Sequence, residues 1–171
     1  MDAPSVEKTP SPPSKDSAIT LREIGKRNWR DIVDLTITES QAPLLSSNAR
    51  SLCESHYSAD AWVRGIYADD TPVGFLMMSI APEVEWYAVW RFMIDQRYQA
   101  MGFGRKAIQL AIAYVKDNYP EADMIRAMSA GPEGKKGVSA KDSPYRFYTR
   151  LGWKEISEDG EGGEVVLGLD L

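Results

Sequence analysis

Apolar and polar residues follow regular patterns along most of the chain, and these patterns predict its first elements. Residues 19–24 alternate between apolar and polar side chains, which is typical of a strand. Residues 28–37 repeat apolar positions at helical spacing behind Asn28, a residue type favoured at helix starts. Residues 46–57 carry a weaker pattern of the same kind. One strand followed by two helices is therefore expected.

The middle of the chain is typical of β structure. Residues 61–69 and 72–80 have the composition of strands, and the Asp-Asp-Thr-Pro sequence at residues 69–72 favours a turn between them. A third strand is expected over residues 86–95, which are rich in aromatic and β-branched side chains. These three strands predict an antiparallel meander.

The second half of the chain combines a well-defined helix with shorter elements. From Phe103 to Val115 the apolar residues fall on one helical face, and Pro120 ends the segment. The remaining elements are a strand over residues 123–129, a Gly- and Lys-rich loop over 130–141, a short helix over 144–151, and two strands around a Gly-rich turn over 153–171. This order predicts an α/β domain with a mixed sheet and flanking helices.

Composition limits the number of domains and their surroundings. The chain has 171 residues, of which 43% are hydrophobic and 26% charged, as expected for one soluble domain with a real core. Residues 1–17 contain little but proline, serine and charged residues and predict a disordered tail, which leaves the domain to residues 18–171. The longest apolar run, residues 73–81, is far shorter than the ~20 residues that cross a bilayer, and the N-terminus lacks the pattern of a secretory signal.

Charge and the metal-binding residue types exclude several classes of function. Lys and Arg number 20 against 25 Asp and Glu, so the net charge of −5 disfavours binding to a nucleic-acid backbone. Cys53 and His56 are the single cysteine and histidine, so the sequence contains neither an internal disulfide nor a Cys/His zinc cluster. A reducing, cytoplasmic setting is expected.

The segment between the third strand of the meander and the main helix carries the strongest chemical signal. Gly102 and Gly104 lie where this loop enters the helix, and small residues there let a ligand approach the backbone. The unpaired N–H groups of the first helical turn then point at an anion such as a diphosphate. Since these donors belong to the main chain, a net negative charge does not prevent binding.

Two other interpretations of this loop have to be weighed. Gly102, Gly104 and Ala107 also fit the G-x-G-x-x-G/A dinucleotide pattern, but residues 96–101 separate them from the strand, and Asp123 falls at the start rather than the end of the next strand. No G-K-[S/T] sequence follows, which excludes a P-loop. The glycines can also serve only to cap a helix.

A second sequence feature narrows the choice. Gln99-x-x-Gly102-x-Gly104, followed by RFYTRLGW at residues 146–153, resembles the GCN5-related N-acetyltransferase (GNAT) family, whose loop reads [QR]-x-x-G-x-[GA]. The order of elements over residues 18–171 is also similar. The sequences WRFMID…YQ and GEVVLGLDL resemble the small-molecule branch, which includes polyamine acetyltransferases. The resemblance implies a mixed sheet of about six to seven strands whose central strands splay apart.

The resemblance also implies acetyl-CoA as co-substrate, with no metal. In such enzymes the strand before the loop lines the pantetheine arm and the loop amides hold the diphosphate. The implied cofactor-binding residues are Phe92, Met93 and Ile94 along the arm and Gln99, Ala100, Met101, Gly102, Phe103, Gly104 and Arg105 in the loop.

Transfer of an acetyl group to an amine needs a proton donor and a proton acceptor. By resemblance, Tyr148 protonates the departing thiolate. The alternative is a core aromatic on the same helical face as Tyr145 and Leu151, and the resemblance favours the acid. A primary amine with a reference pKa near ~10.4 must lose a proton before it reacts, and a carboxylate can accept it. Candidate bases are Glu39, which follows the first helix, and Glu83 and Glu85, which precede the third strand of the meander.

The chain departs from the family pattern at several positions. Ala100 and Met101 stand where Gly-Lys or similar is frequent, which removes a local cation. Lys141 and Pro144 replace a frequent Asn and Ala, and Trp90 lies about where animal diamine acetyltransferases carry a glutamate base. The base and the substrate therefore stay open, and Trp90 is either a core residue or part of an aromatic wall for a cationic amine.

These observations predict an acetyl-CoA-dependent N-acetyltransferase for the primary amine of a small molecule, with polyamines favoured. The alternatives are an amino sugar, amino acid or peptide amine as acceptor, a CoA-binding module without turnover, and NAD-linked redox chemistry. The expected partner is the small-molecule amine, with neither nucleic acid nor membrane, and a homodimer is compatible with the sequence.

Overall fold

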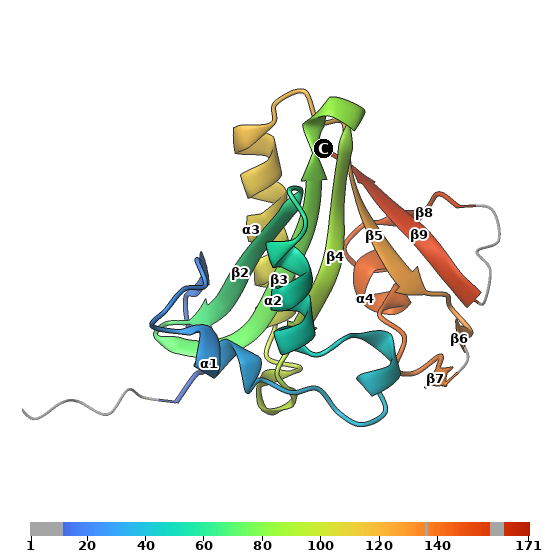
Figure 1. The fold of residues 1–171 in the computed structure, drawn as a ribbon. Coiled ribbons are helices and arrows are strands. Elements are labelled where there is room, and N and C mark those ends of the chain that lie inside the picture. Colours follow the sequence, from blue (N-terminus) through green and yellow to red (C-terminus); the bar gives the residue numbers. More distant parts are fainter. Residues whose placement is uncertain (1–11, 136, 158–162) are drawn as a thin grey trace, which may run out of the picture.

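The computed structural model describes residues 12–135, 137–157 and 163–171, which are built around one mixed sheet (Figure 1). Its strands run in the order β1-β2-β3-β4-β5-β9-β8. Their bounds are Ile19–Arg22 (β1), Ala61–Ala68 (β2), Thr71–Ala81 (β3), Trp86–Ile94 (β4), Met124–Ala130 (β5), Lys154–Glu155 (β8) and Glu164–Asp170 (β9). The helices are Trp29–Val33 (α1), Asn48–His56 (α2), Phe103–Asn118 (α3) and Tyr145–Thr149 (α4), with 3-10 turns at Ala42–Leu44 (η1), Pro82–Val84 (η2) and Gln96–Tyr98 (η3).

The predicted order of elements and the α/β class are confirmed, with one addition. The Gly- and Lys-rich segment expected to be a loop contains a second small sheet, in which β6 (Gly134–Lys135) pairs with β7 (Val138–Ser139). Gly134 and Gly137 have φ angles of 84° and 85°, a conformation that glycine adopts without steric cost. The buried side chain of Val138 anchors this hairpin to the rest of the protein.

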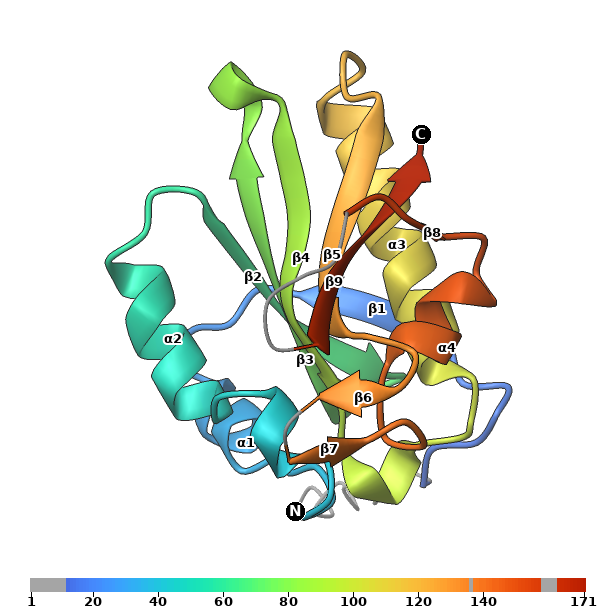
Figure 2. The same ribbon diagram turned by 90° about the vertical axis from the view of Figure 1, so that its right-hand side faces the viewer.

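Helices cover both faces of the sheet. α1 and α2 lie on one face and α3 and α4 on the other (Figure 2). Because alternate residues of a strand point to opposite faces, Phe75 and Met77 of β3 pack with α1, whereas Leu76 and Met78 pack with α3. This two-sided burial explains the nearly continuous apolar run in β3.

The two central strands of the sheet separate along their length. β4 and β5 pair in parallel only at Ala88↔Arg126 and Val89↔Ala127, although β4 continues to Ile94 and β5 to Ala130. The register between β3 and β4 shifts at the same level, where Met77 opposes Arg91 and Met78 opposes Val89, so that Trp90 is an extra residue. Such a bulge bends a strand. The expected splay is confirmed, and Figure 1 shows the two strands diverging from the paired end.

A buried carboxylate fixes the splayed end of β4. Asp95 is fully buried and accepts hydrogen bonds from the Thr36 amide at 2.9 Å and from the Arg97 amide and guanidinium, the latter at 2.7 Å. Burial opposes ionisation of Asp95, but these hydrogen bonds outweigh it and hold the pKa of Asp95 below its usual value. The loop after α1 and the start of η3 are thereby tied to the same point.

The chain preceding β1 contacts the main helix. Residues 1–11 of the predicted tail lie outside the described residues. Residues 14–17 form a turn, and the Lys106 ammonium donates hydrogen bonds to the carbonyls of Lys15 at 2.9 Å and Ser17 at 3.2 Å. Among the helices in the described ranges, none is both long and apolar enough to cross a membrane.

Candidate active site

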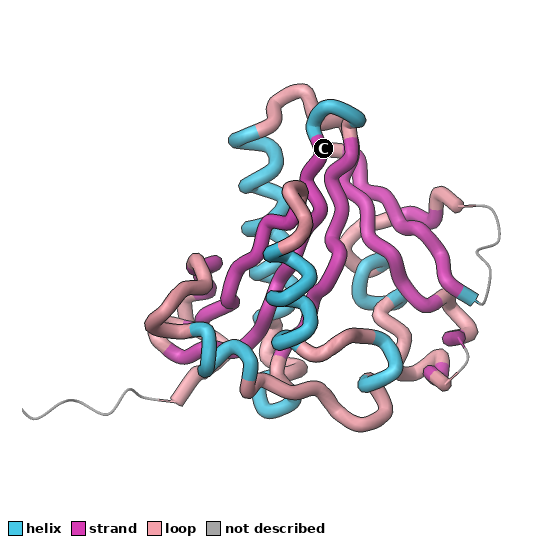
Figure 3. The backbone as a smooth tube through the Cα atoms, in the orientation of Figure 1, coloured by secondary structure: helices cyan, strands magenta, loops and turns pink. Residues whose placement is uncertain are grey.

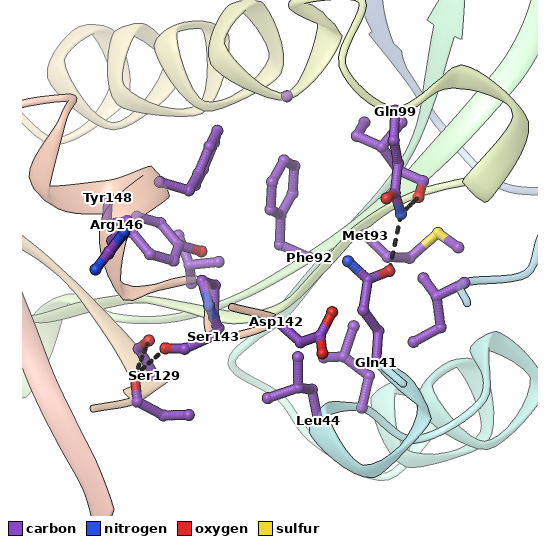
Figure 4. Close-up of a pocket in the computed structure, with 18 of the residues that line it drawn as sticks. Gln41, Leu44, Phe92, Met93, Gln99, Ser129, Asp142, Ser143, Arg146 and Tyr148 are labelled. Atoms are coloured by element: carbon purple, nitrogen blue, oxygen red, sulfur yellow. Dashed lines mark hydrogen bonds between the residues drawn. The ribbon is translucent and has the colours of Figure 1, made fainter. Parts of the chain in front are cut away.

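The gap between the splayed strands opens into a cavity of about 910 Å³. Its wall is built from the free half of β4, the end of β5, the start of α3, the segment before α4 and α4 itself. The loop between α1 and α2 closes one side, through residues that include Gln41 and Leu44 (Figure 4). The cavity therefore exists because β4 and β5 stop pairing after two residues each.

The N-terminus of α3 borders this cavity with unbonded main-chain amides. Gly102 has a φ angle of 85° and precedes the first helical residue, Phe103. Among the described residues, no hydrogen bond within the protein uses the amides of residues 101–105 as donors. Together with the dipole of a 16-residue helix, these amides form a site suited to an anion.

The two glycines of the loop have different tasks. A Cβ at Gly102 would meet no atom within 4 Å, so its positive φ angle is what requires glycine there. At Gly104 a Cβ would lie 3.3 Å from Cε2 of Phe147 and 3.5 Å from Cζ of Phe92. Phe92 and Phe147 stack with ring centroids 5.8 Å apart and both line the cavity. Glycine at position 104 thus lets the helix approach this aromatic pair.

Ala100 has an unusual backbone conformation. Its φ angle of 60° is in the left-handed region, which costs a residue with a Cβ roughly 1–2 kcal/mol relative to glycine's freedom there. The position is one at which the chain departs from the family pattern. The backbone at Ala100 is therefore strained in this turn, and a glycine at the same position would not be.

Gln99 connects the loop before α3 to the far side of the cavity. Its Nε2 donates to the Ile94 carbonyl at 3.0 Å and to Oε1 of Gln41 at 2.9 Å. Gln41 belongs to the loop between α1 and α2, and sequence reasoning missed it because an irregular segment carries no periodicity. The pair holds that loop against the start of α3 (Figure 4).

Tyr148 is at once a core residue and a cavity residue. It is 4% exposed, packs against Phe147 and Trp153 with ring centroids 5.1 Å apart in each case, and lines the cavity. Burial raises the pKa of Tyr148, so its hydroxyl is protonated at neutral pH. The two interpretations offered by the sequence describe different atoms of one side chain: the ring packs and the hydroxyl faces the cavity.

The structure does not bring the predicted carboxylate bases to this cavity. Glu39 is exposed and is not a lining residue, although it lies two positions before Gln41. Glu83 lies in η2 and Glu85 directly follows it, and both are exposed. This turn is at the end of β4 farthest from the splay, and Figure 3 shows it at the opposite end of the sheet from η1. The carbonyl of Glu85 accepts a hydrogen bond from Arg126 at 3.2 Å. The sequence shows that these glutamates precede the strand, but it does not show which end of the strand borders the cavity.

Two other carboxylates do line the cavity, Asp142 and Glu164. Asp142 precedes α4 and Glu164 begins β9. Neither was singled out by sequence, since Asp142 follows a Gly- and Lys-rich loop and Glu164 belongs to an acidic turn typical of a solvated surface. Only the tertiary fold brings Asp142 and Glu164 to the same cavity.

The predicted cofactor-binding residues are mostly assembled in one place. The lining residues among them are Phe92, Met93, Ile94, Gln99, Ala100, Gly102, Phe103, Gly104 and Arg105. Met101 is the exception, because its side chain packs against the hydrophobic core. Trp90 also lines the cavity, and Lys141, Arg146 and Arg150 add positive charge on the α4 side.

Comparison with known proteins agrees with this geometry. The model of the "Acetyltransferase (GNAT) family" matches residues 29–133. A curated relative, "Spermine/spermidine N(1)-acetyltransferase" of Bacillus subtilis, is 30% identical over 163 residues, covering 90% of this chain and 99% of the relative.

Solved structures of similar fold include two N-acetyltransferases. The PaiA N-acetyltransferase of Thermoplasma acidophilum in complex with coenzyme A has a TM-score of 0.63 at 16% identity, covering 90% of this chain and 99% of that one. A spermidine N-acetyltransferase SpeG chimera from Vibrio cholerae and hSSAT has a TM-score of 0.62 at 17% identity, covering 88% and 92%. These likenesses concern the fold. Because the family model spans more than half of the sequence, the chain belongs to the GNAT family of acetyltransferases.

Proposed function

We propose that this protein transfers the acetyl group of acetyl-CoA to a primary amino group of a polyamine of the spermine and spermidine class. One observation carries the proposal: the unbonded amides of residues 101–105 lie at the mouth of a cavity that also contains the Tyr148 side chain. Main-chain donors suited to an anion, an unpaired strand edge and the buried side chain of Tyr148 together support the proposal.

The residues present fit both ends of CoA. The amides at the start of α3 supply main-chain donors for the diphosphate, and Arg105, Arg146 and Arg150 supply positive charge for its phosphates. Residues 90–94 of β4 lack a strand partner on the β5 side, so their main-chain groups are available to the amide-bearing pantetheine arm.

When bound, acetyl-CoA supplies a thioester whose carbonyl carbon accepts the amine. Tyr148, which is protonated at neutral pH, then donates its hydroxyl proton to the sulfur as the carbon–sulfur bond breaks, and the tyrosinate regains a proton from water. A main-chain N–H near Met93 or Ile94 polarises the carbonyl in the manner of an oxyanion hole. The amine loses its proton to water or to a carboxylate, and a role of Glu39 or Glu85 in that step remains a prediction.

The acceptor class is supported by sequence and by chemistry. The curated relative named for spermine and spermidine is matched over 99% of its length. The cavity combines apolar side chains such as Leu44 and Leu45 with the carboxylates of Asp142 and Glu164, which suits a chain of methylene groups separated by ammonium groups. The net charge of −5 also attracts a cation.

A thiol-release assay with acetyl-CoA tests the proposal directly. The acceptors are spermidine, spermine, putrescine, aminoglycosides and lysine. We expect turnover with spermidine and spermine at lower KM than with the others. If CoA binds but no polyamine is acetylated, the polyamine assignment is wrong, and turnover with an aminoglycoside or lysine identifies the acceptor class instead.

A further inference from the structure

Asp142 is a cavity carboxylate held in place by hydroxyl groups. It lies between β7 and α4, is partly buried and lines the cavity. Its Oδ1 accepts a hydrogen bond from Ser40 at 3.1 Å and its Oδ2 accepts one from Ser139 at 2.8 Å. Figure 4 shows the carboxylate directed toward the side of the cavity formed by Gln41 and Leu44.

The two hydroxyls come from different segments of the chain, and neither serine is itself a lining residue of the cavity. Ser40 belongs to the loop between α1 and α2, 102 positions from Asp142, whereas Ser139 ends β7. Their hydrogen bonds fix the orientation of both carboxylate oxygens. Asp142 is therefore aimed by the same loop that Gln41 ties to the start of α3.

Asp142 lacks a cationic partner among the described residues. The ion pairs formed there involve Asp70, Glu54, Glu23 and Asp95 as acids, and not Asp142. Within the described ranges, its hydrogen bonds come from the neutral hydroxyls of Ser40 and Ser139. Such a carboxylate gains from a ligand cation, because charge-assisted hydrogen bonds are about twice as strong as neutral ones. The position is suited to an ammonium group.

The surroundings of Asp142 specify what carries that ammonium group. Ile37, Leu44 and Leu45 line the cavity on the side of the Ser40 loop. Apolar walls favour methylene groups, and a carboxylate between them favours a positive charge at one end. A flexible diamine or polyamine has this alternation, whereas an amino sugar presents hydroxyl groups that the apolar walls would leave unpaired.

We infer that Asp142 binds an ammonium group of the acceptor other than the amine that is acetylated, with Ser40 and Ser139 as positioning residues. The inference rests on the proposed function. A carboxylate next to an amine stabilises the protonated, charged form of that amine. Asp142 thus holds a nitrogen that stays protonated. The reacting nitrogen, which must become neutral, lies elsewhere in the same polyamine molecule.

Replacing Asp142 with asparagine tests this role. Asp142→Asn keeps the size and one of the two acceptor oxygens but removes the charge. We expect the KM for spermidine to rise about 10- to 100-fold, the range expected from losing one charge-assisted hydrogen bond. The KM for acetyl-CoA and the kcat at saturating spermidine should change less than about twofold, because the bond is equally strong in the ground and transition states.

Glu133→Gln is the matched control. Glu133 is exposed in the same segment of the chain and is not a lining residue, so the variant loses the same charge without touching the cavity. Its KM for spermidine should equal that of the wild type. Melting curves of both variants establish that they are folded, and Ser139→Ala, which only loosens the carboxylate, should raise the same KM by about threefold.

The outcomes separate the inference from the proposed function. An unchanged KM for spermidine in Asp142→Asn overturns the inference alone, as does a loss confined to kcat, which would indicate a base. An equal rise of KM in Glu133→Gln also overturns it, since that points to the overall field of the protein. If the wild type acetylates no polyamine, the proposed function fails first.

Discussion

Tyr148 combines packing in the core with a place in the wall of the cavity. Its ring contacts Phe147 and Trp153 in the core, and its hydroxyl belongs to the cavity. Removal of the hydroxyl alone separates the two contributions, because phenylalanine keeps the ring. The neighbouring Tyr145 offers a comparison on the same helix, since its hydroxyl bonds Glu155 at 3.1 Å and it does not line the cavity.

We predict that Tyr148→Phe lowers kcat about 100-fold, the scale of a lost general acid, while the affinity for CoA changes little. Steady-state kinetics and calorimetry with CoA measure the two quantities. Tyr145→Phe should leave both within about twofold of the wild type. Full activity of Tyr148→Phe would remove the tyrosine from the mechanism and leave it as a core aromatic.

The backbone of Ala100 is strained, and glycine at this position would relieve the strain. Because its φ angle is 60°, Ala100→Gly should stabilise the protein by about 0.5–1 kcal/mol, after allowing for the greater freedom of glycine in the unfolded chain. The midpoint of urea unfolding measures the change. Ala113→Gly, in the exposed middle of α3, should instead destabilise by about 1 kcal/mol. A loss of stability in both variants would contradict the strain at position 100.

At the scale of elements, the important event is the end of pairing between β4 and β5. The bulge at Trp90 redirects β4, and Asp95 fixes its far end to Thr36 and Arg97. The wall of the cavity thus depends on one buried carboxylate at the end of a strand. Its ionisation should be visible in the stability of the whole domain.

We predict that the stability contributed by Asp95 depends on pH in the acid range. Because the folded-state pKa of Asp95 is lowered, its contribution is fully present above the unfolded value near ~3.9 and is lost as pH falls through the folded value. Asp95→Asn should cost about 2 kcal/mol at pH 7, the worth of a hydrogen bond to a charged group, and less at pH 3.

Urea unfolding at the two pH values measures this difference. Asp117→Asn, a charge loss on the exposed side of α3, serves as control and should change stability by less than about 0.5 kcal/mol at either pH. An equal cost of Asp95→Asn at pH 7 and pH 3 would show that the carboxylate charge does not stabilise the fold.

At the scale of the whole molecule, two halves of the sheet are joined through few contacts around the cavity. β4 and β5 share two residue pairs, and Gln41 and Ser40 connect the loop between α1 and α2 to Gln99 and Asp142. A ligand that contacts both halves should therefore stabilise the protein as a unit.

We predict that CoA at 100 times its Kd raises the stability by about 2.7 kcal/mol, or about 5–10 °C in Tm. Thermal unfolding with CoA, with 3′,5′-ADP and with pantetheine measures how much the nucleotide and the pantetheine arm each contribute to the rise in Tm. Pantetheine lacks the diphosphate and should give the smallest shift. A shift with NADH and none with CoA would instead revive the dinucleotide interpretation of the loop.

Local sequence was sufficient for most elements of this fold. Period-two and helical patterns predicted the meander, α3 and the final strands, because those segments bury one or both faces against a core. The Gln99-x-x-Gly102-x-Gly104 loop was recognisable because a tight turn into a helix restricts the residues that can occupy it. The small hairpin of β6 and β7 was missed, since two-residue strands are too short to show a period.

The sequence by itself determined the α/β class, the order of elements, the glycine-containing loop before the main helix and the membership of a family. Tertiary structure alone decided which carboxylates reach the cavity: Glu39 and Glu85 do not line it, whereas Asp142 and Glu164 do. The physical reason is that local patterns report whether a residue's own face is buried, while a cavity is made where strands stop pairing and distant loops meet. The contact of Gln41 with Gln99, which lies 58 positions away, is decided by the tertiary structure in this way.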